Sequence, residues 1–190
     1  VGEKTAKLFA KLNIQNIEEL LHNYPRDYET FSQPTLIQDA VSGEFCSIRA
    51  CLVGNITAKK VLNLTILNFT VKDTSGEVFM TYFNTPYIKN ILKKGYFYIF
   101  RGIPQNKNGK LIMEQAKIYK PEEYFKLMGV LQPKYSLTAG LTNHMVAKSV
   151  KQALTVCDVE NDYLPEWIRQ ELQLAPYRQA IEEIHFPPDY

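Results

Sequence analysis

The sequence predicts a mainly β protein with helices on both sides of the β region. Between residues 45 and 120, apolar side chains alternate with a period of two, and β-branched and aromatic residues are frequent. The segments before and after this region repeat their apolar residues at helical spacing instead. With 190 residues, 45% of them hydrophobic, the chain is long enough to bury one main core with flanking elements.

The first 44 residues are expected to form two short helices joined by a turn. The first helix has four apolar residues on one broad face: Ala6, Leu8, Phe9 and Leu12. Asn16 is the expected N-cap of the second helix, Glu19 completes a capping box, and Pro25 ends the apolar pattern. A helix start can hold a phosphate through its free N–H groups. Because this segment has a net charge of −3, packing is the favoured interpretation and phosphate contact the alternative.

Five strands are expected in the β region, over residues 45–56, 62–73, 77–83, 96–103 and 110–119. Turn sequences separate them, because residues 73–76 (Asp-Thr-Ser-Gly) and 106–109 (Asn-Lys-Asn-Gly) are both typical of tight hairpins. Within the second strand, apolar residues occupy even positions as far as Ile66 and odd positions from Leu67 onward. A β-bulge in that strand would account for the change of phase.

A short helix is expected between the third and fourth strands. Thr85 is its expected N-cap and Pro86 its first residue, and a basic last turn ends at Gly95. Three strands, a helix and two more strands is the order of an OB-fold, a five-stranded Greek-key barrel whose outer face and loops commonly bind oligonucleotides. The predicted organisation is therefore a helical segment over 1–44, an OB-fold barrel over 45–120 and a helical linker over 121–190.

The last 70 residues are expected to be helical. Residues 143–157 have apolar side chains at helical spacing, and Leu164-Pro165 and Ala175-Pro176 indicate the starts of two more short helices. The final helix leads into Pro187 and Pro188, a diproline typical of a hinge or linker. We therefore expect another domain to follow in a longer polypeptide.

Positive charge and aromatic rings are concentrated in the β region. Residues 45–120 contain 12 Lys and Arg but 3 Asp and Glu, whereas residues 1–44 have a net charge of −3 and residues 121–190 one of −4. Eleven of the 23 aromatic residues also lie in 45–120. Basic grooves with stacking rings are the requirement for binding single-stranded nucleic acid.

Two aromatic residues and five basic ones are the candidate nucleic-acid contacts. Phe83 ends a predicted strand and Tyr87 lies in the first turn of the following helix, so both rings are expected at the barrel rim, where a ring can stack on a base. The alternative is that one of them fills the barrel mouth. The basic candidates are Lys59 and Lys60 in the loop after the first strand, Arg101 on the fourth, and Lys107 and Lys110 in the last hairpin. Solvated surface charge is the alternative for each of the loop lysines.

Several classes of protein do not fit the sequence. It has no G-x-x-x-x-G-K-[ST] loop for nucleotide phosphates, so this chain is not expected to hydrolyse ATP, and neither a cofactor nor a metal is expected in it. Its three histidines are widely separated, and its three cysteines have no C-x-x-C spacing. No apolar run is long enough to cross a membrane and no signal peptide is recognisable, so a trimmed start and a cytoplasmic location are expected.

Several stretches of the chain resemble the N-terminal region of RecG, the bacterial ATP-dependent helicase that remodels stalled replication forks and Holliday junctions. The stretches are residues 1–6 (VGEKTA), 20–28 (LLHNYPRDY), 73–76 (DTSG), 82–84 (YFN), 133–141 (PKYSLTAGL) and 184–188 (IHFPP). The resemblance implies that the barrel is a wedge that splits a fork, and that two aromatics four residues apart stack on base pairs at the branch point. Phe83 and Tyr87 match that pattern.

The resemblance also implies a longer parent protein active in DNA repair and recombination. Its motor domains would lie in the same polypeptide and would use ATP and Mg²⁺. The expected function of this chain is thus a non-catalytic, monomeric wedge that binds forks and four-way junctions. Two alternatives remain open, an OB-fold module for single-stranded DNA or tRNA and a protein-interaction scaffold whose aromatics are core residues.

Overall fold

The computed structural model describes residues 2–157 and 164–188, which fold into two compact units. One, the barrel unit, spans Ser32–Met128. The other, the helical unit, combines Val1–Phe31 with Gly129–Tyr190. None of the helices in the described residues is long and apolar enough to cross a membrane.

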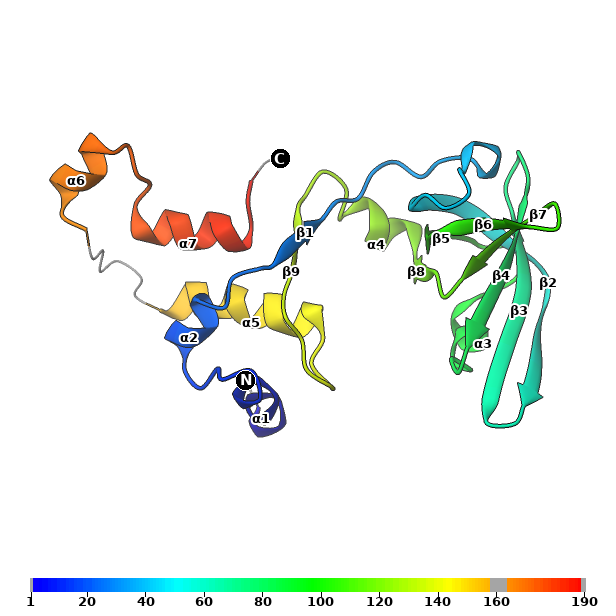
Figure 1. Ribbon diagram of the computed structural model, residues 1–190, viewed down its shortest axis with the longest axis horizontal. Coiled ribbons are helices and arrows are strands. Elements are labelled where there is room, and N and C mark those ends of the chain that lie inside the picture. The colour runs from blue at the N-terminus through cyan, green and yellow to red at the C-terminus, as the bar shows by residue number, and fades with distance from the viewer. Residues whose placement is uncertain (1, 158–163, 189–190) are drawn as a thin grey trace. The chain divides into compact units, whose positions relative to one another are not determined.

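The barrel unit is built on one curled sheet of seven strands (Figure 1). The strands are β2 (Cys46–Val61), β3 (Leu64–Lys72), β4 (Glu77–Phe83), β5 (Phe97–Gly102), β6 (Pro104–Lys107), β7 (Lys110–Glu114) and β8 (Lys117–Tyr119). Their order across the sheet is β6-β7-β4-β3-β2-β5-β8, with only β4 and β7 parallel. The predicted mainly β class with an OB-type barrel is thereby confirmed.

The core of the barrel unit follows from the alternation along its strands. On β3 the residues Leu67, Phe69 and Val71 are buried, while the intervening ones are partly exposed. Phe69 stacks on Tyr82 of β4 with a centroid separation of 5.6 Å and an angle of 8° between the rings. Because successive side chains of a strand point to opposite faces, one face of the sheet forms the core and the other carries the exposed residues.

The predicted β-bulge in the second strand is not where the sheet is irregular. Strand β3 pairs with β4 without interruption from Ile66 to Lys72. The register shift lies in β2 instead, where the paired residues pass from Val53 opposite Thr70 to Thr57 opposite Asn68. Leu62, one of the even-numbered apolar residues that suggested the change of phase, lies in the turn between β2 and β3 and has φ 53°.

The last predicted strand, 110–119, is two strands in the structure. Strand β7 ends at Glu114 and pairs with β6 and β4, whereas β8 pairs with the opposite sheet edge at β5. Gln115, with φ 51°, lies at the break. A left-handed residue cannot continue a strand, so the chain turns there and crosses to the other edge.

Three short helical elements complete the barrel unit: η1 (Ile37–Asp39), α3 (Ile88–Ile91) and α4 (Pro121–Phe125). The predicted helix after β4 is present, but it begins after Tyr87 rather than after Thr85. Asp73 attaches η1 to the β3–β4 turn, because its carboxylate accepts hydrogen bonds from the backbone N–H groups of Ile37, Ser75 and Gly76. The barrel unit therefore extends to Ser32 and Met128, beyond the predicted range of 45–120.

The helical unit joins the two ends of the sequence. It contains α1 (Glu3–Ala10), α2 (Ile17–Leu21), β1 (Asp27–Glu29), β9 (Gln132–Lys134), α5 (Asn143–Val156), α6 (Glu166–Glu171) and α7 (Tyr177–His185). The N-cap predicted for the second helix is present, since the Asn16 side chain accepts from the Glu19 N–H at 2.8 Å. Antiparallel pairing of β1 with β9 links segments that the predicted division had placed in separate domains.

A buried histidine holds the last helix in the helical unit. His185 of α7 is fully buried, and its Nε2–H donates to the carbonyl oxygen of Leu21 at 2.8 Å. Its Nδ1 therefore accepts from the Tyr135 hydroxyl at 2.9 Å. The Tyr28 hydroxyl also donates to the carbonyl of Ile184. Burial lowers the pKa of His185, which favours the neutral ring that this arrangement requires.

Candidate nucleic-acid interface

A sharp turn at the end of β4 positions the two candidate stacking residues. Phe83 is the last residue of β4 and lies opposite Ile66 of β3. Asn84 follows with φ 54°, and it bonds twice to Thr65: its N–H donates to the carbonyl at 2.8 Å, and its Oδ1 accepts from the N–H at 3.0 Å. Asparagine tolerates the left-handed conformation better than most residues, which explains its place at this turn.

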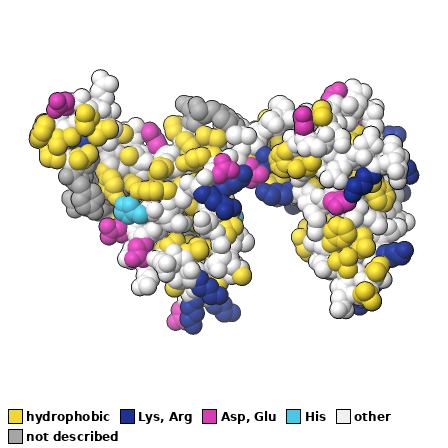
Figure 2. All heavy atoms as spheres, in the orientation of Figure 1, with side chains coloured by type: hydrophobic (Ala, Val, Ile, Leu, Met, Phe, Trp, Pro, Cys, Tyr) yellow, Lys and Arg dark blue, Asp and Glu magenta, His cyan; other side chains and the backbone are white. Residues whose placement is uncertain are grey.

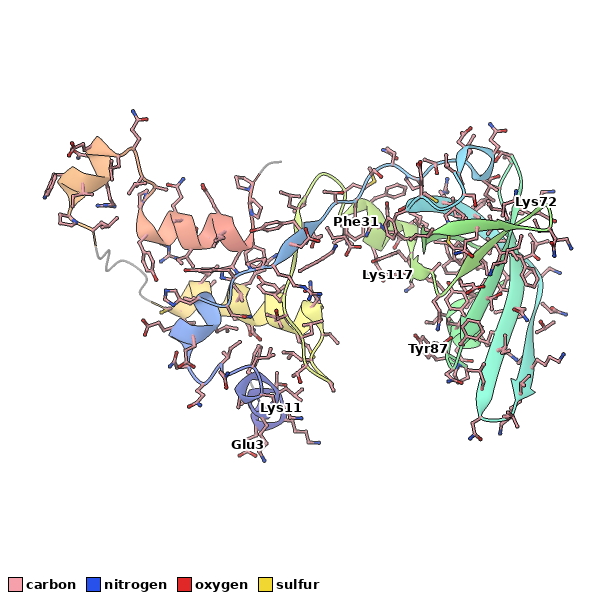
Figure 3. All side chains as sticks on the ribbon, in the orientation of Figure 1. Glu3, Lys11, Phe31, Lys72, Tyr87 and Lys117 are labelled. Atoms are coloured by element: carbon pink, nitrogen blue, oxygen red, sulfur yellow. The ribbon has the colours of Figure 1, made fainter. Side chains whose placement is uncertain are left out.

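Tyr87 lies on the surface just beyond that turn. Its side chain is 58% exposed, and it immediately precedes α3 (Figure 3). It lines a hollow of about 400 Å³, which we call the Tyr87 hollow. The lining residues come from the end of β4, the turn that follows it, α3, and β8 with the two residues before it: Tyr82, Thr85, Tyr87, Ile88, Ile91, Gln115, Ala116, Lys117, Ile118 and Tyr119.

The aromatic residues near this turn divide into exposed and structural ones. Phe83 is half-buried, and its carbonyl accepts from Nε2 of Gln115 at 3.3 Å. Tyr82 is a core residue whose hydroxyl donates to the carbonyl of Ala116 at 2.7 Å, and burial raises its pKa. Of the three aromatic residues near this turn, Tyr87 is thus the one most available for stacking, whereas the Phe83 side chain is only partly accessible.

Lys59 and Lys60 lie on a strand, not in a loop as predicted. Strand β2 continues to Val61, and the two lysines pair with Ile66 and Thr65 of β3. Both are exposed. The pairing fixes their backbones beside the strand end that carries Phe83, because Ile66 pairs with Lys59 on one side and with Phe83 on the other.

Lys107 and Lys110 flank the predicted second hairpin. They face each other as the last pair of β6 and β7, and the turn between them contains Asn108 and Gly109, both with positive φ. Lys107 bonds to Glu114 at 2.9 Å, whereas Lys110 is exposed. The side chains of both lysines are exposed to solvent at the tip of this hairpin.

Arg101 differs from the other candidates because it is buried. It lies on β5, is 6% exposed, and its guanidinium carbon lies 4.8 Å from the centroid of the Phe45 ring. The structure therefore gives Arg101 a packing environment within the barrel unit and does not place it with the exposed lysines.

Sequence reasoning missed Lys117 as a candidate. It is an exposed residue of β8 and lines the Tyr87 hollow, although 30 positions separate it from Tyr87 (Figure 3). A second missed feature is the outward face of the sheet, where Phe79 and Phe97 are exposed and Arg49 lies 4.8 Å from the centroid of the Phe97 ring. Alternation along β4 and β5 was the only available signal for these rings.

The charge distribution on the surface agrees with the division seen in the sequence. Figure 2 shows Lys and Arg side chains scattered over the barrel unit with hydrophobic side chains between them, and fewer acidic ones.

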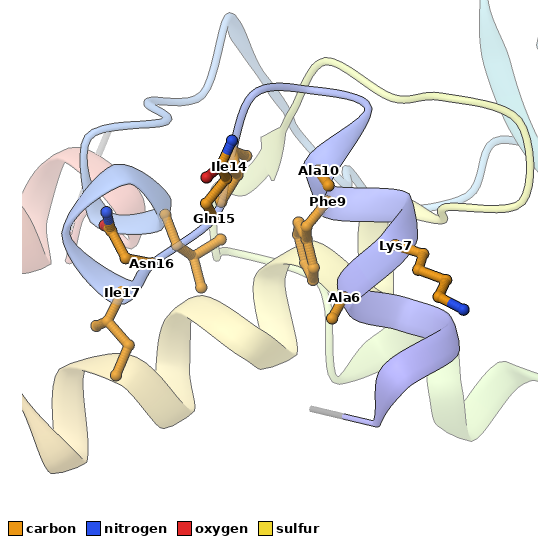
Figure 4. A pocket seen from close by; sticks show the side chains of 9 residues that line it. Ala6, Lys7, Phe9, Ala10, Ile14, Gln15, Asn16 and Ile17 are labelled. Atoms are coloured by element: carbon orange, nitrogen blue, oxygen red, sulfur yellow. The ribbon is translucent and has the colours of Figure 1, made fainter.

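On the helical unit, a separate hollow of about 510 Å³ lies beside α1 and α2 and is lined mostly by apolar residues such as Phe9, Ile14 and Leu20 (Figure 4). That hollow contains none of the predicted contact residues.

Comparison with known proteins connects this geometry to one family. A family model described as the RecG wedge domain matches residues 1–157. The ATP-dependent DNA helicase RecG of Synechocystis sp. is 28% identical over 204 residues, which cover 98% of this chain and 24% of that protein. RecG of Thermotoga maritima is 26% identical over 196 residues, covering 100% of this chain and 25% of that protein.

A solved structure of RecG bound to a three-way DNA junction has the same fold. It aligns with a TM-score of 0.78 at 26% sequence identity, covering 98% of this chain and 26% of that one. The chain thus spans about a quarter of the length of the relatives that it matches.

Proposed function

Because this chain belongs to the RecG wedge domain family, we propose that it binds branched DNA and divides the strands at the branch point. The edge of the barrel unit formed by the β4–α3 turn meets the branch point, and Tyr87 stacks on a base there. Phe83, at the end of β4, shares the contact with DNA. Forks and four-way junctions are the proposed ligands.

The exposed Tyr87 ring, at the start of α3 just after β4, is the observation that carries this proposal. The two Asn84–Thr65 hydrogen bonds fix the turn before Tyr87, and the carbonyl of Tyr87 accepts from the Asn90 N–H at 2.9 Å, so the backbone that carries the ring is held in place before DNA arrives. Lys59 and Lys60 are exposed on β2, where Lys59 pairs with Ile66, the residue that pairs with Phe83 on its other side. An exposed stacking ring on a surface that also carries lysines is the combination that binds single strands without reading their sequence.

We further propose that the lysines of the barrel unit contact phosphates. Lys59, Lys60, Lys107 and Lys110 are exposed or partly exposed and lie on elements that OB-folds use for nucleic acid. Such contacts position the DNA without sequence preference, and their affinity falls steeply with salt. Arg101 contributes to the packing of the barrel unit rather than to DNA contact.

The proposal assigns ATP hydrolysis to a different part of a longer polypeptide. The relatives are ATP-dependent helicases about four times as long as this chain, and its sequence has no phosphate-binding loop. Motor domains in the same polypeptide would supply ATP and Mg²⁺ chemistry, and this chain would hold the junction as a monomer in the cytoplasm.

Competition binding tests the proposed function. A labelled three-way junction is bound to the chain, and unlabelled junction, single strand or duplex of equal length and composition is added as competitor. We expect the junction to compete best, with affinity falling steeply between about 50 and 200 mM salt. If the single strand competes best, the chain is a single-strand binder, and if the labelled junction does not bind at all, the chain is an interaction scaffold.

A further inference from the structure

Three lysines lie along one side of α1 in the helical unit. Lys4, Lys7 and Lys11 are all exposed, and Lys11 follows the last residue of the helix with helical backbone angles. At about 3.6 residues per turn, their spacing places them within about 60° of the helix circumference. The buried Phe9 lies on the opposite side, and Figure 4 shows the Lys7 side chain pointing away from it. The lysines therefore form one exposed row, which we call the α1 lysine row.

The charge of this row is not neutralised within the described part of the chain, where no carboxylate forms an ion pair with any of its three lysines. Residues 3–11 have a net charge of +2, from three lysines and Glu3. The rest of the helical unit has six Lys and Arg against twelve Asp and Glu, a net charge of −6. The electric field of the unit therefore attracts a polyanion to α1 and repels it elsewhere.

The acidic balance of the first 44 residues does not oppose this contact. Their net charge of −3 favoured packing over phosphate binding, but six of their seven acidic residues lie after α1. The helix itself is basic, and Phe9 packs it into the core of the helical unit from the side opposite the lysines. Packing and an anionic ligand thus use different sides of α1.

The length of the row matches the phosphates of one strand of a duplex. A rise of about 1.5 Å per residue separates Lys4 from Lys11 by about 10 Å along the helix. Each strand of a duplex has one phosphate per roughly 3.4 Å of its axis, so about three phosphates fall within that length. Because lysine is a point charge on a flexible stem, such contacts hold DNA without reading its sequence.

The composition of the row favours a duplex over a single strand. Single-strand binders combine basic residues with exposed aromatic rings on which bases stack. The aromatic residue of α1, Phe9, is 5% exposed, and the residues beside the lysines on its surface are Glu3, Ala6 and Ala10. A basic surface without an exposed ring suits DNA whose bases are already stacked on each other.

We propose that the α1 lysine row binds the phosphates of a duplex arm of the branched DNA. The inference rests on the proposed function and adds a second contact to it, because the barrel unit holds the branch point and α1 holds a paired arm. Three phosphate contacts alone bind weakly at physiological salt. Once the barrel unit has bound the junction, however, the arm is tethered to the same chain as α1, so a weak contact adds to the overall affinity.

Salt titrations of a triple variant test this inference. Fluorescence anisotropy gives the affinity of the wild type and of the variant with Lys4→Gln, Lys7→Gln and Lys11→Gln. The DNAs are a three-way junction with arms of about three helical turns, roughly 30 bp, a linear duplex and a single strand. Each phosphate contact contributes about 0.9 to the slope of log affinity against log salt, so the variant should lower the slope for junction and duplex by about 2 to 3. The slope for the single strand should not change.

Two results would overturn the inference. An unchanged slope for the junction means that the row contacts no phosphate. An equal loss of slope for the single strand means that the row does not select a duplex. In both cases the proposed function stands if the wild type still prefers the junction. If the wild type has no such preference, the proposed function fails, and the duplex titration still shows whether α1 binds phosphates.

Three further variants exclude a loss of folding as the cause. Gln, Arg and Lys have similar helix propensities, so the triple variants to Gln and to Arg should both melt within about 4 °C of the wild type. The arginine variant keeps the charge and should keep the slope. Lys148→Gln removes an exposed charge on α5 and should leave the slope unchanged. Glu3→Lys should steepen it by up to about 0.9 and tighten duplex binding, and failure to do so would contradict the inference.

Discussion

The substitution Tyr87→Ala is expected to weaken DNA binding without changing the stability of the fold. The side chain is 58% exposed, and the turn that holds it is fixed by Asn84 and Thr65 rather than by the ring. Substitutions at such surface positions change the free energy of unfolding by about 0.5 kcal/mol or less. Loss of one stacked base costs about 1–3 kcal/mol of binding, which corresponds to about 5- to 150-fold weaker affinity for a junction.

The assay pairs fluorescence anisotropy of a labelled three-way junction with thermal melting of the free protein. Tyr96→Ala is the matched control, because Tyr96 is 63% exposed in the same unit but does not line the Tyr87 hollow. We expect the melting temperature of each variant to stay within about 4 °C of the wild type. Equal loss of binding in the two variants, or a large drop in melting temperature for Tyr87→Ala alone, would refute the assignment of Tyr87 as the stacking residue.

Three further predictions concern phosphate contact, the β4 turn and pH. Changing Lys59 and Lys60 together to glutamine should lower the slope of log affinity against log salt by up to about 1.8, measured in salt titrations with a duplex-armed junction. Asn84→Ala should lower the free energy of unfolding by about 1–2 kcal/mol in urea titrations, because alanine is strained at φ 54°. Burial lowers the pKa of His185 below its ordinary 6.5, so the unfolded chain binds the proton more readily, and stability should fall as the pH drops below about 6.5 and stay level above it.

Each of these predictions has an outcome that contradicts it. An unchanged salt slope means that neither lysine contacts a phosphate. For the turn, Asn84→Gly serves as control, since glycine accepts the left-handed conformation, and equal stability of the alanine and glycine variants would exclude strain as the cause. For the histidine, His185→Phe should remove the pH dependence between pH 7.5 and 5.5, and its persistence in that variant would assign it to other groups.

The strands and the charged region could be predicted from sequence because both are local properties. Alternation and turn residues located β2 to β5 and the hairpin at Asn108 and Gly109, and counting charges located the basic region. The length of β2 was underestimated because Lys59 and Lys60 are typical of a loop, whereas their pairing with β3 depends on a partner strand. Tertiary pairing overrides local preference at such positions.

The parts of the site that escaped prediction depend on contacts between distant segments. Lys117 lines the Tyr87 hollow only because Gln115 breaks the strand and directs β8 to the opposite sheet edge. Arg101 looks like an exposed strand arginine in the sequence, and its burial against Phe45 follows from the packing of the barrel unit. The pairing of β1 with β9 likewise joins residues more than 100 positions apart, which no local pattern can indicate.

The location of the DNA contact is the central claim, and amide chemical-shift mapping tests it most directly. The 21.9 kDa chain is labelled with ¹⁵N, and its spectrum is recorded while a three-way junction is added. The account predicts that the largest changes lie from Phe83 to Ile91 and at Gln115 and Lys117, with smaller changes near Lys59 and Lys60. Changes confined to the helical unit, or absent from the β4–α3 turn, would contradict it.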